Sequence, residues 1–251
     1  MKIQIMVAAH KPYWIPEDDI YLPVFVGAAG KQITPDYVRD DTGDNISLKN
    51  PTFCELTGLY WVWKNVDADV YGLCHYRRYL GGGEFRRKKT ERLLKGEEIQ
   101  QLLASSDIIL PKKRHYWIET RESQYAHAHH IEDLECVEGI LSERYPDYLS
   151  AWKWMLGTRS GHICNMFIMR KEQFDTYCNW LFDILFEAER RLDISTYADK
   201  DKRVFGYLGE RLLDVWIMTN KLVYAEKPMI TLEDQHWIQK GFHFLRRKFQ
   251  H

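Results

Sequence analysis

Short apolar runs alternate with longer helical segments along this chain, and that alternation restricts the fold more than any other feature of the sequence. Strand-like runs occupy residues 3–9, 70–74, 107–110 and 163–169. Segments of helical character occupy residues 53–65, 96–105, 121–144, 171–191 and 203–220. Strands that alternate with helices favour parallel pairing, because each helix carries the chain back to where the next strand starts. We therefore predict an α/β fold with a central, mostly parallel sheet flanked by helices.

The length of 251 residues suits one large domain or two small ones. No internal repeat or low-complexity linker divides the chain, and we predict a single domain over residues 1–235. Residues 11–51 are rich in Pro, Asp, Gly and Asn. They are long for a structureless loop, which indicates either a functional segment or short strands within it. Residues 236–251 combine aromatic and basic side chains, and we predict a basic amphipathic tail there.

Charge and cysteine content narrow the class of protein. The net charge is −1 and the pI about 6.8, so the global basic field typical of a nucleic-acid-binding protein is absent. The five cysteines are dispersed without a CxxC pair, which argues against disulfides and favours a reducing compartment. The first apolar run is too short for a signal peptide, and no run approaches the roughly 20 apolar residues of a membrane span. We expect a cytoplasmic protein. The tail either docks on its own domain or makes peripheral contact with an anionic membrane.

Polar and cationic side chains follow directly on the strand at residues 70–74. They are His75, Tyr76, Arg77 and Arg78. In an open α/β sheet, ligands bind in the crevice outside the carboxyl ends of the strands. Guanidinium groups bind phosphate oxygens in bidentate geometry, and tyrosine rings pack on sugars or bases. The segment therefore predicts a site for an anionic ligand that contains a ring; the alternative is a basic surface turn.

Asp67 and Asp69 form a DxD pattern, the arrangement by which many nucleotide-sugar transferases hold a divalent metal. The metal-binding pattern stands at the carboxyl end of its strand, whereas this pair precedes the strand. We therefore interpret it as a solvated turn. The cationic residues at the other end favour a site that needs no cofactor, and Mn²⁺ or Mg²⁺ is not favoured.

Three histidines cluster in the segment 121–144, at His127, His129 and His130. Three histidines could bind zinc, but this spacing is weakly specific. Polar ligands for an acceptor sugar, with His127 the candidate, or ordinary surface histidines are the alternatives.

Two carboxylates lie one turn apart in the helical segment 203–220, Glu210 and Asp214. A carboxylate near the start of a helix is stabilised by the helix dipole, which gives a structural interpretation. A positioned carboxylate could equally take a proton from a hydroxyl group. Both residues are candidates for a catalytic base.

Four blocks of the chain together resemble a known domain family. They span residues 45–65, which include Cys-Glu-Leu-Thr-Gly at 54–58, residues 72–79, which include His-Tyr-Arg-Arg at 75–78, and residues 159–169 and 208–216. The family is encoded in capsular and exopolysaccharide gene clusters and was long described as of unknown function. Some of its members are linked to galactofuranosyl transfer. The resemblance covers nearly the whole chain.

This resemblance implies a GT-A-like glycosyltransferase fold and a sugar-nucleotide transferase, inverting at the anomeric carbon. The expected donor is a UDP-sugar, with UDP-galactofuranose the first candidate, and the expected acceptor a lipid-linked oligosaccharide at the inner membrane face. Glu210, with Asp214 in reserve, would deprotonate the acceptor. His75, Arg77 and Arg78 would stabilise the departing UDP. The residues expected to orient sugars are Glu55, His162 and Asn165.

Two alternatives remain open at this point. The first is a non-catalytic nucleotide-sugar or carbohydrate-binding module, which would bind UDP without consuming a UDP-sugar. The second is a metal-dependent hydrolase that uses the three histidines and would contain zinc.

Overall fold

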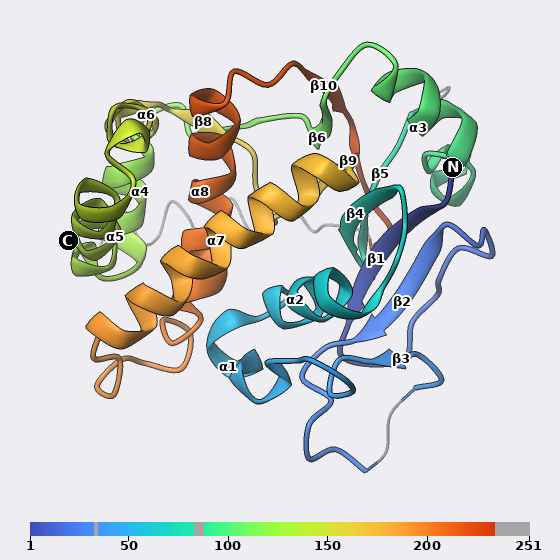
Figure 1. Cartoon of the computed structure of the whole chain (residues 1–251), viewed down its shortest axis with the longest axis horizontal. Helices are drawn as coiled ribbons and strands as arrows, with labels where there is room; N and C mark the ends of the chain where they lie inside the picture. The colour runs from blue at the N-terminus through green and yellow to red at the C-terminus, as the bar shows by residue number, and fades with distance from the viewer. Residues whose placement is uncertain (33–34, 83–87, 234–251) are drawn as a thin grey trace.

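A computed structural model of the protein describes residues 1–32, 35–82 and 88–233. The predicted α/β architecture is confirmed (Figure 1). In the described residues, nine strands form the main sheet: β1 (Ile3–Ala9), β2 (Tyr21–Phe25), β3 (Val38–Arg39), β4 (Val70–His75), β5 (Arg78–Leu80), β6 (Ile108–Pro111), β9 (Phe167–Arg170), β10 (Tyr224–Lys227) and β11 (Met229–Thr231). A separate two-stranded sheet consists of β7 (Arg114–His115) and β8 (Ser160–Gly161).

The sheet is mostly parallel, and two of its described strands run in the opposite direction: β9 near its centre and β5 beside β4. Its order is β10-β6-β9-β4-β1-β2-β3, and β5 joins β4 to β11 outside this path. β1 runs parallel to both β2 and β4. β9 lies between β4 and β6 and is antiparallel to both. β4 and β6 therefore point the same way, and the carboxyl ends of β1, β4 and β6 share one edge of the sheet.

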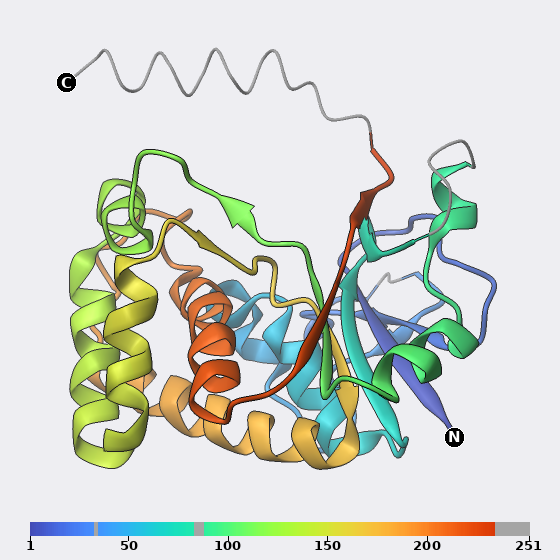
Figure 2. The same cartoon turned by 90° about the horizontal axis from the view of Figure 1, so that it is seen from above.

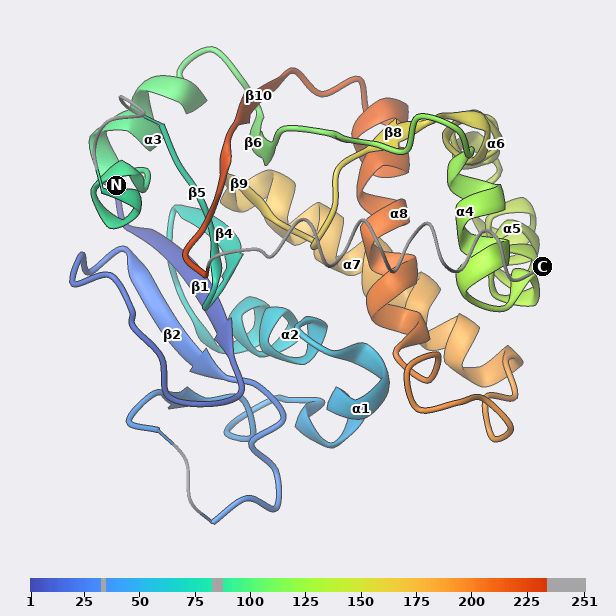
Figure 3. The same ribbon diagram turned by 180° about the vertical axis from the view of Figure 1, so that it is seen from behind.

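Helices cover the sheet on both sides and extend it with a helical region. They are α1 (Asn50–Phe53), α2 (Leu56–Asn65), α3 (Gly96–Leu103), α4 (Arg121–Ala128), α5 (Ile131–Arg144), α6 (Pro146–Gly157), α7 (Lys171–Arg191) and α8 (Val204–Thr219), with 3₁₀ turns η1 (Ser47–Lys49) and η2 (Lys89–Arg92). α2 packs on β1, α7 on β4 and β9, and α3 on β6 and β9. Figure 2 shows α3 on the other side of the sheet from α2. α8 lies between the sheet and the group α4–α6 (Figure 3).

Burial of apolar side chains explains why these elements form. β1 and β4 are buried along almost their whole length, which is the pattern expected of central parallel strands covered on both faces. α7 buries a stripe that includes Phe174, Trp180 and Leu185. At nearly 25 cal/mol per Å² of apolar surface, such burial is the main source of folding free energy. None of the described helices combines the length and the apolar character that crossing a bilayer requires.

Several boundaries differ from those predicted. The helix predicted at residues 53–65 is interrupted at Cys54, whose φ of 53° and ψ of −129° separate α1 from α2. The helix predicted at residues 121–144 is divided at His129, which is extended, and α6 follows as a further helix. The strand predicted at residues 163–169 begins only at Phe167, because Cys164 and Asn165 adopt positive φ values. The short strands β2 and β3 lie within residues 11–51, as one interpretation of that region required.

Residues 236–251, where we predicted the basic amphipathic tail, lie outside the described residues.

Candidate functional site

The carboxyl end of β4 is the starting point of the site. Its last residue, His75, is level with Ala8 of β1. The Nε2 atom of His75 lies 2.7 Å from the carbonyl oxygen of Cys164. A carbonyl oxygen only accepts hydrogen bonds, so His75 donates from Nε2. This bond joins the end of β4 to the loop 162–166, which precedes β9.

The two predicted arginines, which follow β4, have different side-chain partners. Arg77 forms an ion pair with Glu233, with 2.8 Å between Nη1 and Oε2. Arg78 begins β5 and is half-buried, and its guanidinium forms no hydrogen bond or ion pair within the described ranges. Burial raises the pKa of the Cys164 thiol to about 12, and the nearby charge of Arg78 opposes this rise. Arg78 therefore lies beside loop 162–166, and none of the described residues competes with an anionic ligand for its guanidinium.

Cations that were not predicted from the sequence, Lys11, Lys31 and Arg203, join the predicted Arg77 near His10. Burial lowers the pKa of His10, and four nearby cations lower it further: Lys11, Arg77, Lys31 and Arg203. His10 and Lys11 directly follow the first strand, so the rule that placed His75 could have found them. Lys31 follows β2, which was not predicted. The arrangement produces a local positive field in a chain of net charge −1.

Tyr76, predicted to pack on a ligand ring, has a different role. Its side chain is buried, and its ring contacts those of His10 and Tyr13 edge-to-face, each at a centroid distance of 5.1 Å. The guanidinium of Arg77 lies 4.8 Å from the centroid of the same ring. The ring has little surface left for a ligand, and it supports the cationic turn instead.

Loop 162–166 brings two of the predicted polar residues together. Cys164 and Asn165 have φ values of 70° and 50°. This turn directs the Asn165 amide toward Glu55, the residue before α2, whose Oε1 accepts from Asn165 Nδ2 at 2.9 Å. The same Nδ2 donates to the carbonyl oxygen of Gly206 on α8 at 3.1 Å. Asn165 Oδ1 is buried and has no partner in the described part of the chain.

Glu210 faces the same loop from α8. The backbone of Cys164 lies close enough to the Glu210 carboxylate to oppose the rise of its pKa. Burial raises the pKa of Glu210, the charge of Glu55 raises it further, and Arg211 lowers it in part. A carboxylate whose pKa is raised toward neutrality is better matched to accept a proton from a hydroxyl group.

The position of Glu210 in its helix differs from the prediction. α8 begins at Val204, its first turn contains no acidic residue, and Glu210 lies in the second turn. The helix dipole acts mainly within the first turn, so it does not explain this carboxylate.

Two glycines of α8 allow the site to close around Glu210. A Cβ atom on Gly209 would lie 3.0 Å from Asn165 Oδ1, and one on Gly206 would lie 3.3 Å from Cys54 Sγ. Both contacts are tighter than ordinary side-chain packing. The family resemblance includes the block 208–216, but only the structure shows that these positions leave no room for a larger side chain.

Asp214, the reserve candidate for the base, is already engaged. Its carboxylate forms an ion pair with Arg121 and accepts from His162 Nδ1 at 2.5 Å. Burial would raise the pKa of Asp214, but the His162 hydrogen bond and the charges of Arg121 and His162 outweigh burial and hold it below its usual value. The lowered pKa makes Asp214 a weak base. Arg121 also donates to the backbone carbonyl of Glu210 at 3.3 Å.

His162 was predicted to orient a sugar, and the structure corrects this. Its side chain is 2% exposed. Nε2 lies 3.0 Å from Glu226 Oε1, while Nδ1 is taken by Asp214. No ring nitrogen is left for a ligand, so His162 links α8 to β10 instead.

The three clustered histidines diverge. His127 is exposed and pairs with Glu119. His129 forms a hydrogen bond with Asp201 and stacks on Tyr207. His130 stacks on Tyr197. No three His, Cys, Asp or Glu side chains of the described residues are grouped to hold a metal ion. The hydrolase alternative therefore loses its zinc site in this part of the chain. The structure does not bring His127 together with the other candidates.

Asp67 and Asp69 lie at the amino end of β4, opposite His75, as predicted. Asp69 accepts from the backbone N–H of Lys2 at 2.7 Å. Asp67 is almost fully exposed, and its nearest cation is Lys171 at 3.8 Å.

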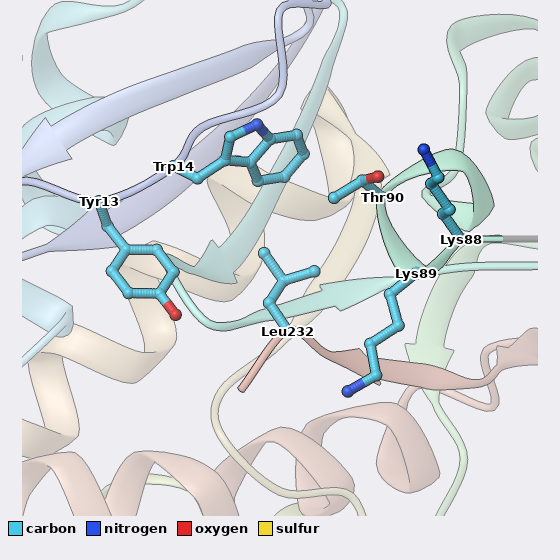
Figure 4. A pocket seen from close by; sticks show the side chains of 6 residues that line it. All are labelled: Tyr13, Trp14, Lys88, Lys89, Thr90 and Leu232. Carbon is cyan, nitrogen blue, oxygen red and sulfur yellow. The ribbon is translucent and has the colours of Figure 1, made fainter. Parts of the chain in front are cut away.

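A cavity of about 590 Å³ adjoins the arginine-bearing turn. Its lining comes from the segment after β1, from η2 and from the end of β11 (Figure 4): Tyr13, Trp14, Lys88, Lys89, Thr90 and Leu232. The backbone N–H of Leu232 donates to the carbonyl oxygen of Arg77 at 3.0 Å. The cavity wall is thus attached directly to the turn that follows β4.

Comparison with known proteins places this geometry in a family. Residues 4–221 match a domain family described as a domain of unknown function, DUF4422. No curated protein matches the chain. A solved structure of the bifunctional glycosyltransferase WbbM in its apo form is similar, with 32% sequence identity and a TM-score of 0.85.

That similarity covers 93% of this chain and 46% of the WbbM chain, so the chain spans about half the length of that protein. The match confirms the expected GT-A-like arrangement, a mostly parallel central sheet flanked by helices.

Proposed function

Because the chain belongs to the DUF4422 family and its fold matches that of a glycosyltransferase, we propose that it transfers a sugar from a nucleotide donor to a saccharide acceptor. The observation that carries the proposal is the composition of the sheet edge. A group of cations surrounds the end of β1 and β4, and a carboxylate with a raised pKa faces the adjacent loop. The cations can neutralise the charge of a diphosphate leaving group, and the carboxylate can accept the proton of an acceptor hydroxyl.

The donor in this proposal is a UDP-sugar, with galactofuranose as the sugar. Arg78 and the cations around His10 bind the diphosphate and neutralise the charge that develops as UDP departs. The choice of galactofuranose rests on the family resemblance. The acceptor is a lipid-linked oligosaccharide, and transfer takes place at the cytoplasmic side of the membrane.

The reaction is a single displacement with inversion at the anomeric carbon. The acceptor oxygen forms a bond to the anomeric carbon while the bond from that carbon to the diphosphate oxygen breaks. UDP leaves with the electron pair, and the proton of the acceptor hydroxyl passes to the Glu210 carboxylate. Because burial raises the pKa of Glu210, its carboxylate is a better proton acceptor than that of an ordinary glutamate.

Polar neighbours hold the base and the sugars in place. Asn165 fixes Glu55 through the 2.9 Å hydrogen bond, and we assign both to the sugar-facing side of the site. Arg121 binds the backbone of Glu210 and the side chain of Asp214, so it acts as a positioning residue. Substrate contact by His127 remains a prediction without support from its position.

A divalent metal does not fit the residues at this edge. Where a DxD pattern would supply carboxylates, β4 ends in His75, followed by Tyr76 and two arginines. Cationic side chains repel a metal ion and themselves compensate phosphate charge. We propose that the protein works without a metal cofactor.

The second candidate function is a non-catalytic module that binds a nucleotide-sugar. The cation group supports it as well as it supports a transferase, because binding needs only the charge. The carboxylate Glu210 favours the transferase, since a raised pKa serves proton transfer and contributes nothing to anion binding.

Two measurements separate these candidates. UDP and UDP-sugars should raise the melting temperature, since a ligand at 100 times its Kd stabilises a protein by about 2.7 kcal/mol. ADP and GDP serve as controls. Release of UDP from a UDP-sugar, measured with a lipid-linked or synthetic saccharide acceptor, should then depend on both substrates. Stabilisation by UDP without any turnover across a panel of donors and acceptors would support the module instead.

A further inference from the structure

The segment between β6 and α4 presents two large apolar side chains to solvent. Trp117 is 81% exposed and Ile118 is 63% exposed. Adjacent exposed apolar residues of this size are unusual on a soluble surface and mark sites of interaction. The sequence before the pair is basic, with Lys112, Lys113 and Arg114, and the acidic residue that follows the pair, Glu119, is paired with His127.

The tip of this segment is held in a defined shape. β7 pairs with β8, and the backbone N–H of Tyr116 donates to the carbonyl oxygen of Arg159 at 2.8 Å. The N–H of Ile118 donates to the carbonyl oxygen of Tyr116 at 2.6 Å, which closes a tight turn around Trp117. Trp117 has a φ of 56°, a conformation that a bulky residue rarely adopts. The turn therefore presents both side chains outward on a fixed frame.

The segment lies on the side of the molecule that carries the candidate site. β6 and β4 point the same way, so Pro111 and His75 end at the same sheet edge with only β9 between them. Two strand spacings amount to roughly 10 Å. Arg114 is close enough to Cys164 of loop 162–166 for its charge to act on that thiol. In Figure 2, the green segment with β7 lies at the upper edge of the view, on the side where β11 ends.

We infer that residues 112–118 dock the protein on an anionic membrane surface. Tryptophan is the residue that concentrates at the interface between lipid and water, and an adjacent isoleucine adds apolar surface that can enter the acyl region. Lysine and arginine beside them are attracted to anionic headgroups. The charge pattern favours a lipid surface over an apolar protein groove, because three cations precede the apolar pair, while Glu119, which follows it, is paired with His127.

Docking through this segment would orient the candidate site relative to the membrane. The sheet edge with His75 and Arg78 would face the membrane, where a lipid-linked acceptor resides. This consequence rests on the proposed function, whereas membrane docking itself does not. The docking test below uses vesicles alone, so its failure and the failure of the transferase proposal are distinguishable.

The test is flotation of the full chain with vesicles. One set contains phosphatidylcholine with about one third phosphatidylglycerol, and the other phosphatidylcholine alone. We expect binding to the anionic vesicles that weakens as salt is raised, because screening shortens the reach of the basic side chains. Absence of binding to anionic vesicles at low salt would overturn the inference.

Variants locate the contact. The double variant Trp117→Asn with Ile118→Ser should reduce partitioning about tenfold or more, since two large apolar groups no longer leave water. Asparagine tolerates a positive φ, so the turn should persist. Lys112→Gln and Lys113→Gln should each reduce binding to anionic vesicles about fivefold.

The matched control is Trp154→Ala on α6. Trp154 is 54% exposed, and its neighbour Lys153 is paired with Glu138. This control should bind vesicles as the unchanged protein does. Equal binding by the Trp117 and Ile118 double variant, with an unchanged melting temperature, would show that another surface makes the contact and would refute the inference. A protein partner captured by this segment, without vesicle binding, would likewise refute it.

Discussion

Glu210 and Asp214 lie one turn apart on α8, yet their surroundings move their pKa values in opposite directions. Burial and the charge of Glu55 raise the pKa of Glu210. Hydrogen bonding to His162 and the charge of Arg121 lower that of Asp214 in spite of its burial. Two carboxylates separated in this way take different roles. We assign proton transfer to Glu210 and a structural role to Asp214.

Replacement of Glu210 by glutamine tests this assignment. Glu210→Gln keeps the shape of the side chain and removes the proton acceptor. We expect turnover to fall by about 10²–10⁴ while the affinity for UDP is retained. The measurements are UDP release under saturating substrates and UDP binding by calorimetry. Near-normal turnover in a folded Glu210→Gln protein would place the base elsewhere.

The pH profile gives a second view of the same residue. The base acts only when it is deprotonated, so activity should rise with pH as Glu210 loses its proton. Because the pKa of Glu210 is raised, this rise should occur above the range of an ordinary glutamate. The residual activity of Glu210→Gln should lack this acid limb. An identical limb in both proteins would mean that another group controls it.

Arg78 is the second residue whose removal is informative. Arg78→Ala removes a charge-assisted contact that we expect to contribute roughly 1.5–3 kcal/mol to UDP binding. The affinity for UDP should drop about tenfold or more without loss of the fold. Arg77 is paired with Glu233, so Arg77→Ala should have a smaller effect. Arg190→Ala, an exposed arginine on α7, is the control and should leave binding unchanged. Unchanged UDP affinity in both Arg77→Ala and Arg78→Ala would rule out the site at the end of β4.

At the scale of single elements, local pattern predicted regular segments and missed the turns that build the site. The residues 171–191 were predicted as a helix and form α7 with the same bounds. Its apolar stripe makes the period visible in the sequence. The apolar residues on either side of Cys164 and Asn165 predict a continuous strand, although Asn165 is of a type that adopts a positive φ more readily than most. Long-range hydrogen bonds hold that turn, and no local rule contains them.

The residues of the candidate site likewise divide into those that the local sequence pattern predicts and those that it does not. His75, Arg77 and Arg78 were found because they follow a recognisable strand. Lys31 and Arg203 were missed, since their approach to His10 depends on how β2 and α8 pack. The partners of His162 come from α8 and β10, which lie more than 50 residues away in sequence.

The ion pair between Arg121 and Asp214 joins α4 to α8, and both side chains are at least nine-tenths buried. Arg121→Met removes the guanidinium and leaves the buried Asp214 carboxylate with His162 as its remaining side-chain partner among the described residues. We expect the free energy of unfolding to fall by roughly 3–5 kcal/mol, as for other broken buried pairs. Denaturation in urea measures this change.

A surface pair provides the matched control. Arg144 and Asp183 join α5 to α7, and both are more than one third exposed. Arg144→Met should therefore cost under about 1 kcal/mol. Equal effects of the two variants would show that the pair between Arg121 and Asp214 does not stabilise the packing of α4 on α8.

At the scale of the whole molecule, the direction of the strands separates the charges around β4. The carboxylates Asp67 and Asp69 stand at its amino end, and His75 with two arginines stands at its carboxyl end. The sheet therefore presents cations at the edge where ligands bind in open α/β folds. The two groups are only a few residues apart in sequence, and the extended strand between them places them at opposite edges of the sheet.

Chelation tests what this separation implies. Side-chain cations already compensate the diphosphate charge in the proposed reaction, so EDTA should leave most of the UDP release intact. Asp67→Ala should change neither activity nor stability appreciably, because that side chain is almost fully exposed. Asp69→Ala removes the hydrogen bond to the backbone of Lys2 and should cost about 0.5–1.5 kcal/mol of stability with little effect on turnover. Complete loss of activity in EDTA, restored by Mn²⁺ or Mg²⁺, would contradict the proposal and require carboxylate ligands at the donor site. If Asp67→Ala or Asp69→Ala then lost the metal-restored activity, those aspartates would be the ligands. If both variants retained it, the ligands would have to be sought at Glu55 and Glu210, the carboxylates that face loop 162–166.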